Sequence, residues 1–124
     1  MKFKLFKKRG FRPFKRRLNT KRKGDRYEHH VAWKMRLHGY LFVKVCGHAS
    51  DYGCDVTAFC LPFGKIVVQC KNYSGKVGVK AVQEVYAAKR YYHATRAAVA
   101  TNSTFTRNAQ ELAKKCGVRL WEKY

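Results

Sequence analysis

Two strand-like runs separated by a short turn constrain the fold of this chain most. CDVTAFC (54–60) and KIVVQCK (65–71) are rich in residues that favour β-structure, and LPFG (61–64) between them has the composition of a turn. The pattern predicts an antiparallel hairpin, in which residue numbers that sum to about 125 lie opposite each other. We therefore expect the fold to be built around that hairpin.

The end of the second run is unusually polar for so apolar a strand. Side chains alternate along a strand, so Gln69 and Lys71 share one face while Cys70 points to the other. Asp55 faces Cys70 in the expected register, or Gln69 if the register shifts by one residue. Two polar side chains at a buried end cost desolvation free energy unless they serve a purpose there. Either the strand emerges into solvent, or Asp55, Gln69 and Lys71 converge on a site.

The remaining segments alternate between helical and strand-like patterns. Strands are expected at 40–46, 97–103 and 118–122, and helices at 25–39, 79–94 and 104–117. The predicted order is α-β-β-β-α-β-α-β, which favours an α/β fold with a mixed sheet and helices on both faces. A chain of 124 residues is long enough for one such domain.

Capping signals predict where the helices begin and end. Asp25 has the character of an N-cap, Glu28 follows it three residues later as in a capping box, and Gly39 is the expected C-terminal stop. Glu28 also lies on the apolar side of this helix, which is an unusual place for a carboxylate. The last helix is expected to begin at Thr104 or Thr106 and to stop at Gly117.

The charge of the chain points to a polyanionic partner. Lys and Arg number 28 against 7 Asp and Glu, for a net charge of +21. Residues 1–24 hold twelve of the basic residues and no acidic one, so we expect a flexible basic arm, followed by a domain over 25–124 that is basic in its own right. DNA is the expected partner, and an anionic membrane surface is the alternative. The arm residues expected to contact DNA are Arg12, Arg16, Arg17, Lys21, Arg22 and Lys23.

The cysteines indicate a reducing compartment. There are five cysteines and no CxxC pair, which argues against a disulfide framework or a zinc site. We therefore expect free thiols, buried as small apolar side chains, and a cytoplasmic, DNA-associated protein. No apolar run approaches the length of a membrane span, and the N-terminus lacks the apolar core of a secretory signal. No small-molecule substrate is expected.

The residues at the end of the hairpin suit metal-dependent chemistry. The Asp55 carboxylate and the Gln69 amide oxygen are hard ligands of the kind that Mg²⁺ prefers, and Glu28 could complete the site. The Lys71 ammonium could orient a water molecule or stabilise charge on a phosphate. The expected DNA contacts around this site are Tyr73, Lys76 and Lys80 in the following loop, and Asn102 and Ser103 before the last helix.

The residues of this site also resemble a known family. D-x(13)-Q-C-K after a G-x-D element is similar to the Mrr-type restriction endonucleases of the PD-(D/E)xK nuclease superfamily, a branch in which Gln replaces the usual acidic residue. DRYEHHVAWKMRLHGY resembles the family's first helix, with its acidic residue at Glu28, and DYGCDV places the metal-binding aspartate at Asp55. IVVQCKNYSGKVG, AVATNSTFTRNAQELA and GVRLWE resemble the family's later blocks. The resemblance covers nearly all of residues 25–122.

The resemblance implies a restriction-endonuclease-like fold and Mg²⁺-dependent hydrolysis of DNA phosphodiester bonds, with Mn²⁺ as a substitute. Glu28, Asp55, Gln69 and Lys71 would be catalytic, with Asp55, Gln69 and the main-chain carbonyl of Cys70 on the metal. Lys71 would act on the attacking water, and Gln69→Glu would preserve activity because it restores the acidic ligand. A homodimer is expected, since a double-strand cut needs two sites. A structure-selective nuclease such as a Holliday junction resolvase and an inactive DNA-binding module are the alternatives.

Overall fold

The computed structural model describes residues 14–46 and 53–124, with side chains from residue 24 onward. Helices and strands alternate in the predicted order, so the predicted fold class is confirmed. The elements are α2 (Phe14–Leu37), β1 (Leu41–Val45), β2 (Val56–Cys60), β3 (Gly64–Lys71), α3 (Val79–Tyr91), β4 (Arg96–Thr101), α4 (Arg107–Cys116) and β5 (Val118–Trp121).

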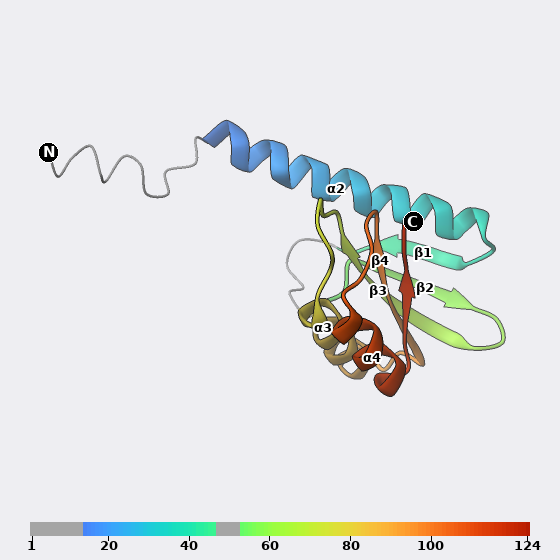
Figure 1. Ribbon diagram of the computed structural model, residues 1–124. Helices are drawn as coiled ribbons and strands as arrows, with labels where there is room; N and C mark the ends of the chain where they lie inside the picture. The colour runs from blue at the N-terminus through green and yellow to red at the C-terminus, as the bar shows by residue number, and fades with distance from the viewer. Residues whose placement is uncertain (1–13, 47–52) are drawn as a thin grey trace, which may run out of the picture.

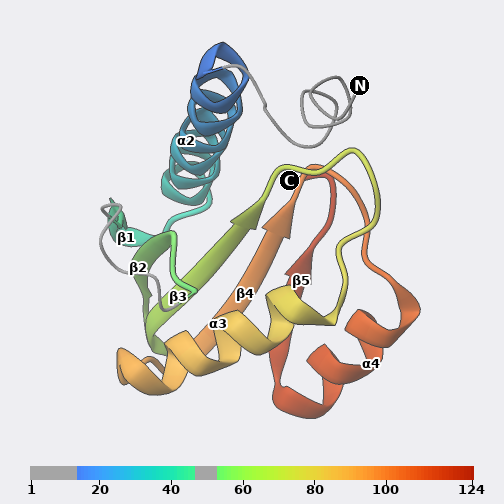
Figure 2. The same ribbon diagram turned by 90° about the vertical axis from the view of Figure 1, so that its left-hand side faces the viewer.

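The five strands form one mixed sheet in the order β1-β2-β3-β4-β5. β1 pairs antiparallel with β2. β2 pairs antiparallel with β3, because the connection between them at 61–63 is a short turn. β3, β4 and β5 pair in parallel, because α3 and α4 carry the chain back between them. Figure 2 shows these three strands side by side with their arrows pointing the same way. The carboxyl ends of β3 and β4 therefore lie at one edge of the sheet.

The two faces of the sheet pack against different helices. Ile66 and Val68 of β3 face α2, where they join Met35 in one fully buried cluster. Val67, between them in sequence, faces the opposite way and packs with Val85 of α3 in a second cluster. Figure 1 shows the result, with α2 on one side of the sheet and α3 and α4 on the other. The alternation along β3 thus supports a core on each side.

The predicted start of the first helix at Asp25 is wrong. α2 begins at Phe14 and runs through Asp25 without interruption. The capping signal is a local one, whereas the Lys and Arg residues before it are good helix formers, and a single interior glycine costs only about 1 kcal/mol. Residues 14–24, expected as part of a flexible arm, are therefore helical, and residues 1–13 lie outside the described residues. Glu28 lies inside the helix, so it caps nothing.

Three other helix ends agree with their predicted signals. Gly39 follows the end of α2 with a φ of +88°, a conformation that glycine adopts without strain. Thr106 caps α4, and its hydroxyl accepts a hydrogen bond from the Ala109 N–H at 3.2 Å. The stop after α4 is Gly117, in the left-handed conformation. Of the two candidate caps for the last helix, Thr106 is the one used.

The predicted end of the 79–94 helix is wrong, because α3 ends at Tyr91. His93 adopts a left-handed φ of +53°, and the Ala94 N–H donates to the Lys89 carbonyl at 2.9 Å. This hydrogen bond closes the helix in the manner of a Schellman motif. The sequence offers no glycine there, so the stop signal is absent from the residue pattern.

All five cysteines are free thiols, as the sequence predicts. Cys54 is buried, and the Sγ atoms of Cys54 and Cys46 lie 3.3 Å apart. The other four cysteines are only partly buried, so they are less enclosed than expected. Within residues 14–46 and 53–124, no helix is both long enough and apolar enough to span a bilayer.

Candidate active site

Asp55 is held rigidly at the entrance to β2. Its N–H donates to the Val68 carbonyl and its carbonyl accepts from the Cys46 N–H, both at 2.8 Å. Its carboxylate Oδ2 accepts a hydrogen bond from the Cys70 N–H, also at 2.8 Å. The hairpin pairs Val56 with Val68, so Asp55 precedes the pairing by one step and lies opposite Gln69. The one-residue shift in register is therefore the alternative that the chain adopts.

The environment of Asp55 favours its protonated form. Burial raises the pKa of this carboxyl group, while the Cys70 N–H and the Lys71 ammonium partly oppose that increase. A buried carboxylate with a raised pKa is an unstable arrangement unless positive charge is available nearby. The site thus favours the approach of a cation.

Glu28 reaches the same place from α2. Burial raises the pKa of its carboxyl group to about 7, and the negative charge of Asp55 and a hydrogen bond between the two carboxyl groups contribute to the increase. Residues far apart in the chain thus bring two acidic groups into contact. The apolar side of the helix, on which the sequence places Glu28, is the side that packs on the sheet, with Val31 and Ala32 fully buried there.

Gln69 and Lys71 lie on the α3 face of β3, in phase with the buried Val67. Gln69 is 7% exposed, so its amide needs hydrogen-bond partners. In the orientation that satisfies both amide atoms, the nitrogen donates to the Gly53 carbonyl at 2.5 Å and the oxygen accepts from Lys71 Nζ at 3.2 Å. In the opposite orientation the nitrogen lies 3.4 Å from Glu84 Oε2. The first orientation pairs more atoms, and we adopt it.

Glu84 of α3 also contacts this cluster, and the sequence pattern did not single it out. Its Oε2 lies 3.4 Å from Lys71 Nζ, and both side chains are largely buried, at 32% and 19% exposed. Helical periodicity draws attention to the apolar positions of α3, and Glu84 lies beside that stripe. The available signal was the scarcity of acidic residues, because only seven occur in the chain and Glu84 is one of them.

The donor atoms at this edge of the sheet fit Mg²⁺. The described residues contain no group of three or more His, Cys, Asp or Glu side chains with the geometry of a metal site. Mg²⁺, however, is commonly held by one or two carboxylates and retains several waters. Asp55 and Glu28 supply carboxylates whose raised pKa values a cation would lower. The Gln69 amide oxygen and the Cys70 carbonyl could add neutral oxygen ligands.

The residues expected to bind DNA occupy different environments. Tyr73 and Lys76 are exposed in the loop after β3, whereas Lys80, expected in that loop, is exposed in the first turn of α3. Asn102 has a structural task, because its amide accepts from the Tyr73 N–H at 2.8 Å and donates to the Tyr73 carbonyl at 3.0 Å. The N–H of Ser103 is occupied by the Thr101 hydroxyl at 3.1 Å. The Asn102 side chain and the Ser103 N–H thus take part in holding this loop, and contact of these two residues with DNA stays a prediction.

The arm residues can be placed only in part. Arg16, Arg17, Lys21, Arg22 and Lys23 lie on the backbone of α2, where their side chains are outside the described atoms. Arg12 lies outside the described residues altogether. These six positions remain predictions.

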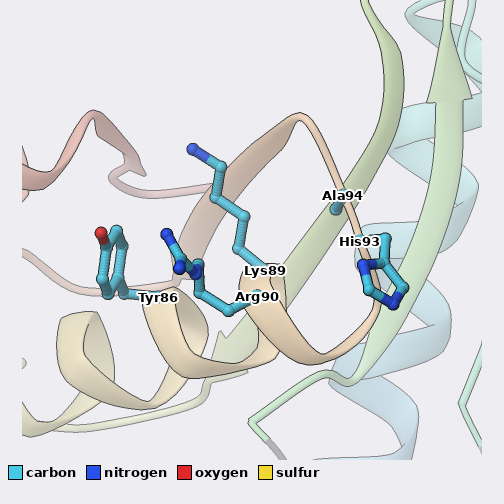
Figure 3. Close-up of a pocket in the computed structure, with 5 residues that line it drawn as sticks. All are labelled: Tyr86, Lys89, Arg90, His93 and Ala94. Atoms are coloured by element: carbon cyan, nitrogen blue, oxygen red, sulfur yellow. The ribbon is translucent and has the colours of Figure 1, made fainter.

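A separate cavity lies at the other end of α3. It has a volume of about 510 Å³ and is lined by Tyr86, Lys89, Arg90, His93 and Ala94. Figure 3 shows Tyr86, Lys89 and Arg90 projecting from the helix, with His93 and Ala94 just beyond its end. The lining is basic and contains no carboxylate, so it suits an anion and not a metal ion. It contains none of the residues predicted to be catalytic.

Comparison with solved structures agrees with the fold. A protein of unknown function, AF1548, has a similar crystal structure, with a TM-score of 0.65 at 22% identity over 77% of this chain. MspJI restriction endonuclease in complex with a 27-mer oligonucleotide has a TM-score of 0.56 at 17% identity over 87% of this chain. The chain spans only 55% of the first protein and 28% of the second. At these identities the two structures support the fold alone.

Sequence comparison identifies the family. No curated protein matches the chain. The family model described as a restriction endonuclease, Mrr_cat, matches residues 20–124, a range that contains Glu28, Asp55, Gln69, Lys71 and Glu84. This chain therefore belongs to the Mrr-type restriction endonuclease family.

Proposed function

We propose that the chain is a Mg²⁺-dependent DNA endonuclease of the PD-(D/E)xK type that hydrolyses phosphodiester bonds. Membership of the restriction endonuclease family supports a nuclease that acts on DNA. The observation that carries the finer proposal is the meeting of the Glu28 and Asp55 carboxyl groups, from α2 and the hairpin, beside the Lys71 ammonium. Such a set combines cation ligands with a positive group that can act on water or phosphate.

Each residue has a separate task in this proposal. Asp55, Glu28, the Gln69 amide oxygen and the Cys70 carbonyl would hold Mg²⁺, which polarises the phosphate and stabilises the charge that develops on it. The Cys70 N–H fixes the Asp55 carboxylate at 2.8 Å, so this ligand is already oriented. Lys71, at 19% exposed, holds the attacking water by hydrogen bonding through Nζ. Glu28, with a pKa of about 7, loses its proton as the cation site forms.

DNA binding would combine the arm with the domain surface. Residues 25–124 contain sixteen basic and seven acidic residues, so the domain attracts phosphates without the arm. Lys76 and Lys80, exposed after β3, are well placed to follow the backbone next to Lys71. The free thiols are compatible with a cytoplasmic protein associated with DNA.

We further propose a homodimer. Large apolar side chains are exposed around the β1–β2 edge of the sheet, which is more apolar surface than a solvated edge requires. They are Leu41, Phe42, Phe59, Leu61 and Phe63, exposed by 43%, 82%, 42%, 76% and 50%. A second copy that covers this surface would bring two active sites into one particle, as a double-strand cut needs. Sedimentation at micromolar concentration tests the proposal, and a monomer at all concentrations with single-strand nicking would contradict it.

The decisive test of the nuclease is cleavage with a matched inactive variant. Wild type and Lys71→Ala, purified in parallel, are incubated with Mg²⁺, Mn²⁺ or EDTA. The substrates are linear duplex, methylated duplex, single-stranded and four-way junction DNA. We expect cleavage only with metal, and a loss of about 100-fold or more in Lys71→Ala without loss of DNA binding. Equal cleavage by Lys71→Ala would overturn the assignment, and preference for the junction would identify a structure-selective nuclease.

A further inference from the structure

Glu84 makes a close ion pair with the lysine of the site. It lies in the second turn of α3, and its Oε2 is 3.4 Å from Lys71 Nζ. Its other oxygen lies 4.0 Å from Lys80 Nζ, but Lys80 is 88% exposed. Exposed pairs of that kind contribute little, because water screens them and the side chains must be ordered. Lys71, at 19% exposed, is therefore the partner that matters.

The main chain at Glu84 also touches the segment that leads into Asp55. A Cβ placed on Gly53 would lie 2.4 Å from the Glu84 carbonyl oxygen and 2.9 Å from the Glu84 Cβ. Gly53 also has a φ of +75°, which other residues rarely adopt. Only glycine permits so close an approach. One turn of α3 thus contacts Lys71 through a side chain and the Asp55 segment through its backbone.

Position 69 lies close to Glu84, and the Lys71 ammonium is shared between them. In the adopted orientation the Gln69 amide oxygen accepts from Lys71 Nζ at 3.2 Å, and Glu84 Oε2 lies 3.4 Å from the same ammonium nitrogen. A carboxylate at position 69 would place a second negative charge against Glu84, and it would lose the hydrogen bond that the amide donates to the Gly53 carbonyl. Two carboxylates so close together cannot both ionise freely. The site therefore accommodates one negative charge from these two positions.

We propose that Glu84 is a positioning residue, which supplies from α3 the negative charge that position 69 lacks and holds the Lys71 ammonium toward the attacking water. The inference rests on the proposed endonuclease function. The superfamily resemblance implies that Gln69→Glu preserves activity. The role of Glu84 predicts that Gln69→Glu lowers activity, because the added carboxylate lies against Glu84.

A charge-exchange series tests this proposal. Gln69→Glu and Glu84→Gln are each compared with wild type and with the double variant in which both changes are made. Each single change should lower kcat by about tenfold or more while KM for DNA changes little, since misplaced groups in the site affect turnover more than binding. The double variant should recover most of the lost kcat. Glu111→Gln, an exposed helical glutamate with the same change in charge, is the control and should match wild type.

Thermal unfolding in EDTA gives a readout that depends on neither cleavage nor metal. Gln69→Glu should lower Tm by about 4 °C or more, and addition of Glu84→Gln should restore it. Glu84→Asp keeps the charge but shortens its reach, so it should unfold near the wild-type Tm and cleave more slowly than wild type. The Tm of each variant also shows that it is folded.

The possible outcomes separate this inference from the proposed function. A Gln69→Glu protein with wild-type kcat and Tm, or a double variant no better than the worse single variant, overturns the role of Glu84. If wild type cleaves none of the DNA substrates, the endonuclease proposal fails. In that case the Tm series still decides whether Glu84 and position 69 share one charge, and an unchanged Tm in Gln69→Glu refutes it.

Discussion

Removal of the Glu28 charge should stabilise the metal-free protein at alkaline pH. Glu28 lies inside α2 with its carboxyl group against that of Asp55, and burial followed by the Asp55 charge raises its pKa from 4.5 to about 7. Glutamine has the same shape and no charge, so Glu28→Gln removes the cost of ionising the group and leaves the packing intact. If Glu28 serves the proposed active site, the charge is maintained there at the expense of stability.

The size and sign of the effect follow from the pKa. An increase from 4.5 to about 7 corresponds to about 3 kcal/mol, at about 1.4 kcal/mol for each pH unit. Glu28 is only partly buried, so solvent screening reduces this value and we expect about 1–2 kcal/mol. The folded state holds the proton more tightly than the unfolded state. The free energy of unfolding therefore falls as the pH rises from 4.5 to about 7, and the whole penalty is present above that range.

The assay is denaturant unfolding in EDTA at pH 5 and pH 8, with Glu111→Gln as the control for a change of one surface charge. Glu28→Gln should exceed wild type in the free energy of unfolding at pH 8 and differ little from it at pH 5. Mg²⁺ should raise the stability of wild type at pH 8 and leave that of Glu28→Gln nearly unchanged. A variant that is less stable than wild type at pH 8, or a difference independent of pH, would refute the reasoning.

Three further changes have defined outcomes. Asp55→Asn keeps an acceptor for the main-chain N–H of Cys70 but should lose both Mg²⁺ binding, measured by calorimetry, and cleavage. If the variant keeps either Mg²⁺ binding or cleavage, Asp55 is not the ligand that makes cleavage depend on the metal. Gly53→Ala should lower the free energy of unfolding by about 1–3 kcal/mol and remove most activity, because the added Cβ would collide with the main chain of Glu84. Gly75→Ala, which has open space around the added Cβ, should change neither stability nor activity. Deletion of residues 1–13 removes six basic residues and should flatten the slope of log binding constant against log salt by up to about 5, measured by fluorescence anisotropy. An unchanged slope would mean that this segment does not contact DNA.

The hairpin and the order of elements were predictable because their signals are short-range. Alternation of apolar side chains and a turn at 61–64 define β2 and β3, and the pairing differs from the first expected register by one residue. That one residue places Asp55 opposite Gln69, and no local pattern selects it. The hydrogen bonds that tie Asp55 to Val68 and Cys70 select it instead.

The errors arose where a local signal competed with longer-range preferences. Asp25 and Glu28 have the composition of a capping box, yet the helix-forming residues before them extend α2 back to Phe14. Glu84 could not be placed in the site from helical periodicity, because its contact with Lys71 depends on how α3 packs across β3. Glu28 and Glu84 are two of only seven acidic residues in the chain. The scarcity of acidic residues was therefore a better guide to the site than helical periodicity.

The way in which the site is distributed over the fold has a consequence for refolding. Asp55, Gln69 and Lys71 belong to one hairpin, whose halves are joined by the turn at 61–63 and pair over a short stretch of chain. Glu28 and Glu84 join them only when α2 and α3 dock on opposite faces of the sheet, and α3 docks together with the parallel pairing of β3 and β4. Contacts between residues close in sequence form sooner, because closing a short loop costs less entropy. Three of the five residues of the proposed site therefore come together early, and after dilution from denaturant the proposed cleavage of DNA should return later than the helical circular dichroism signal.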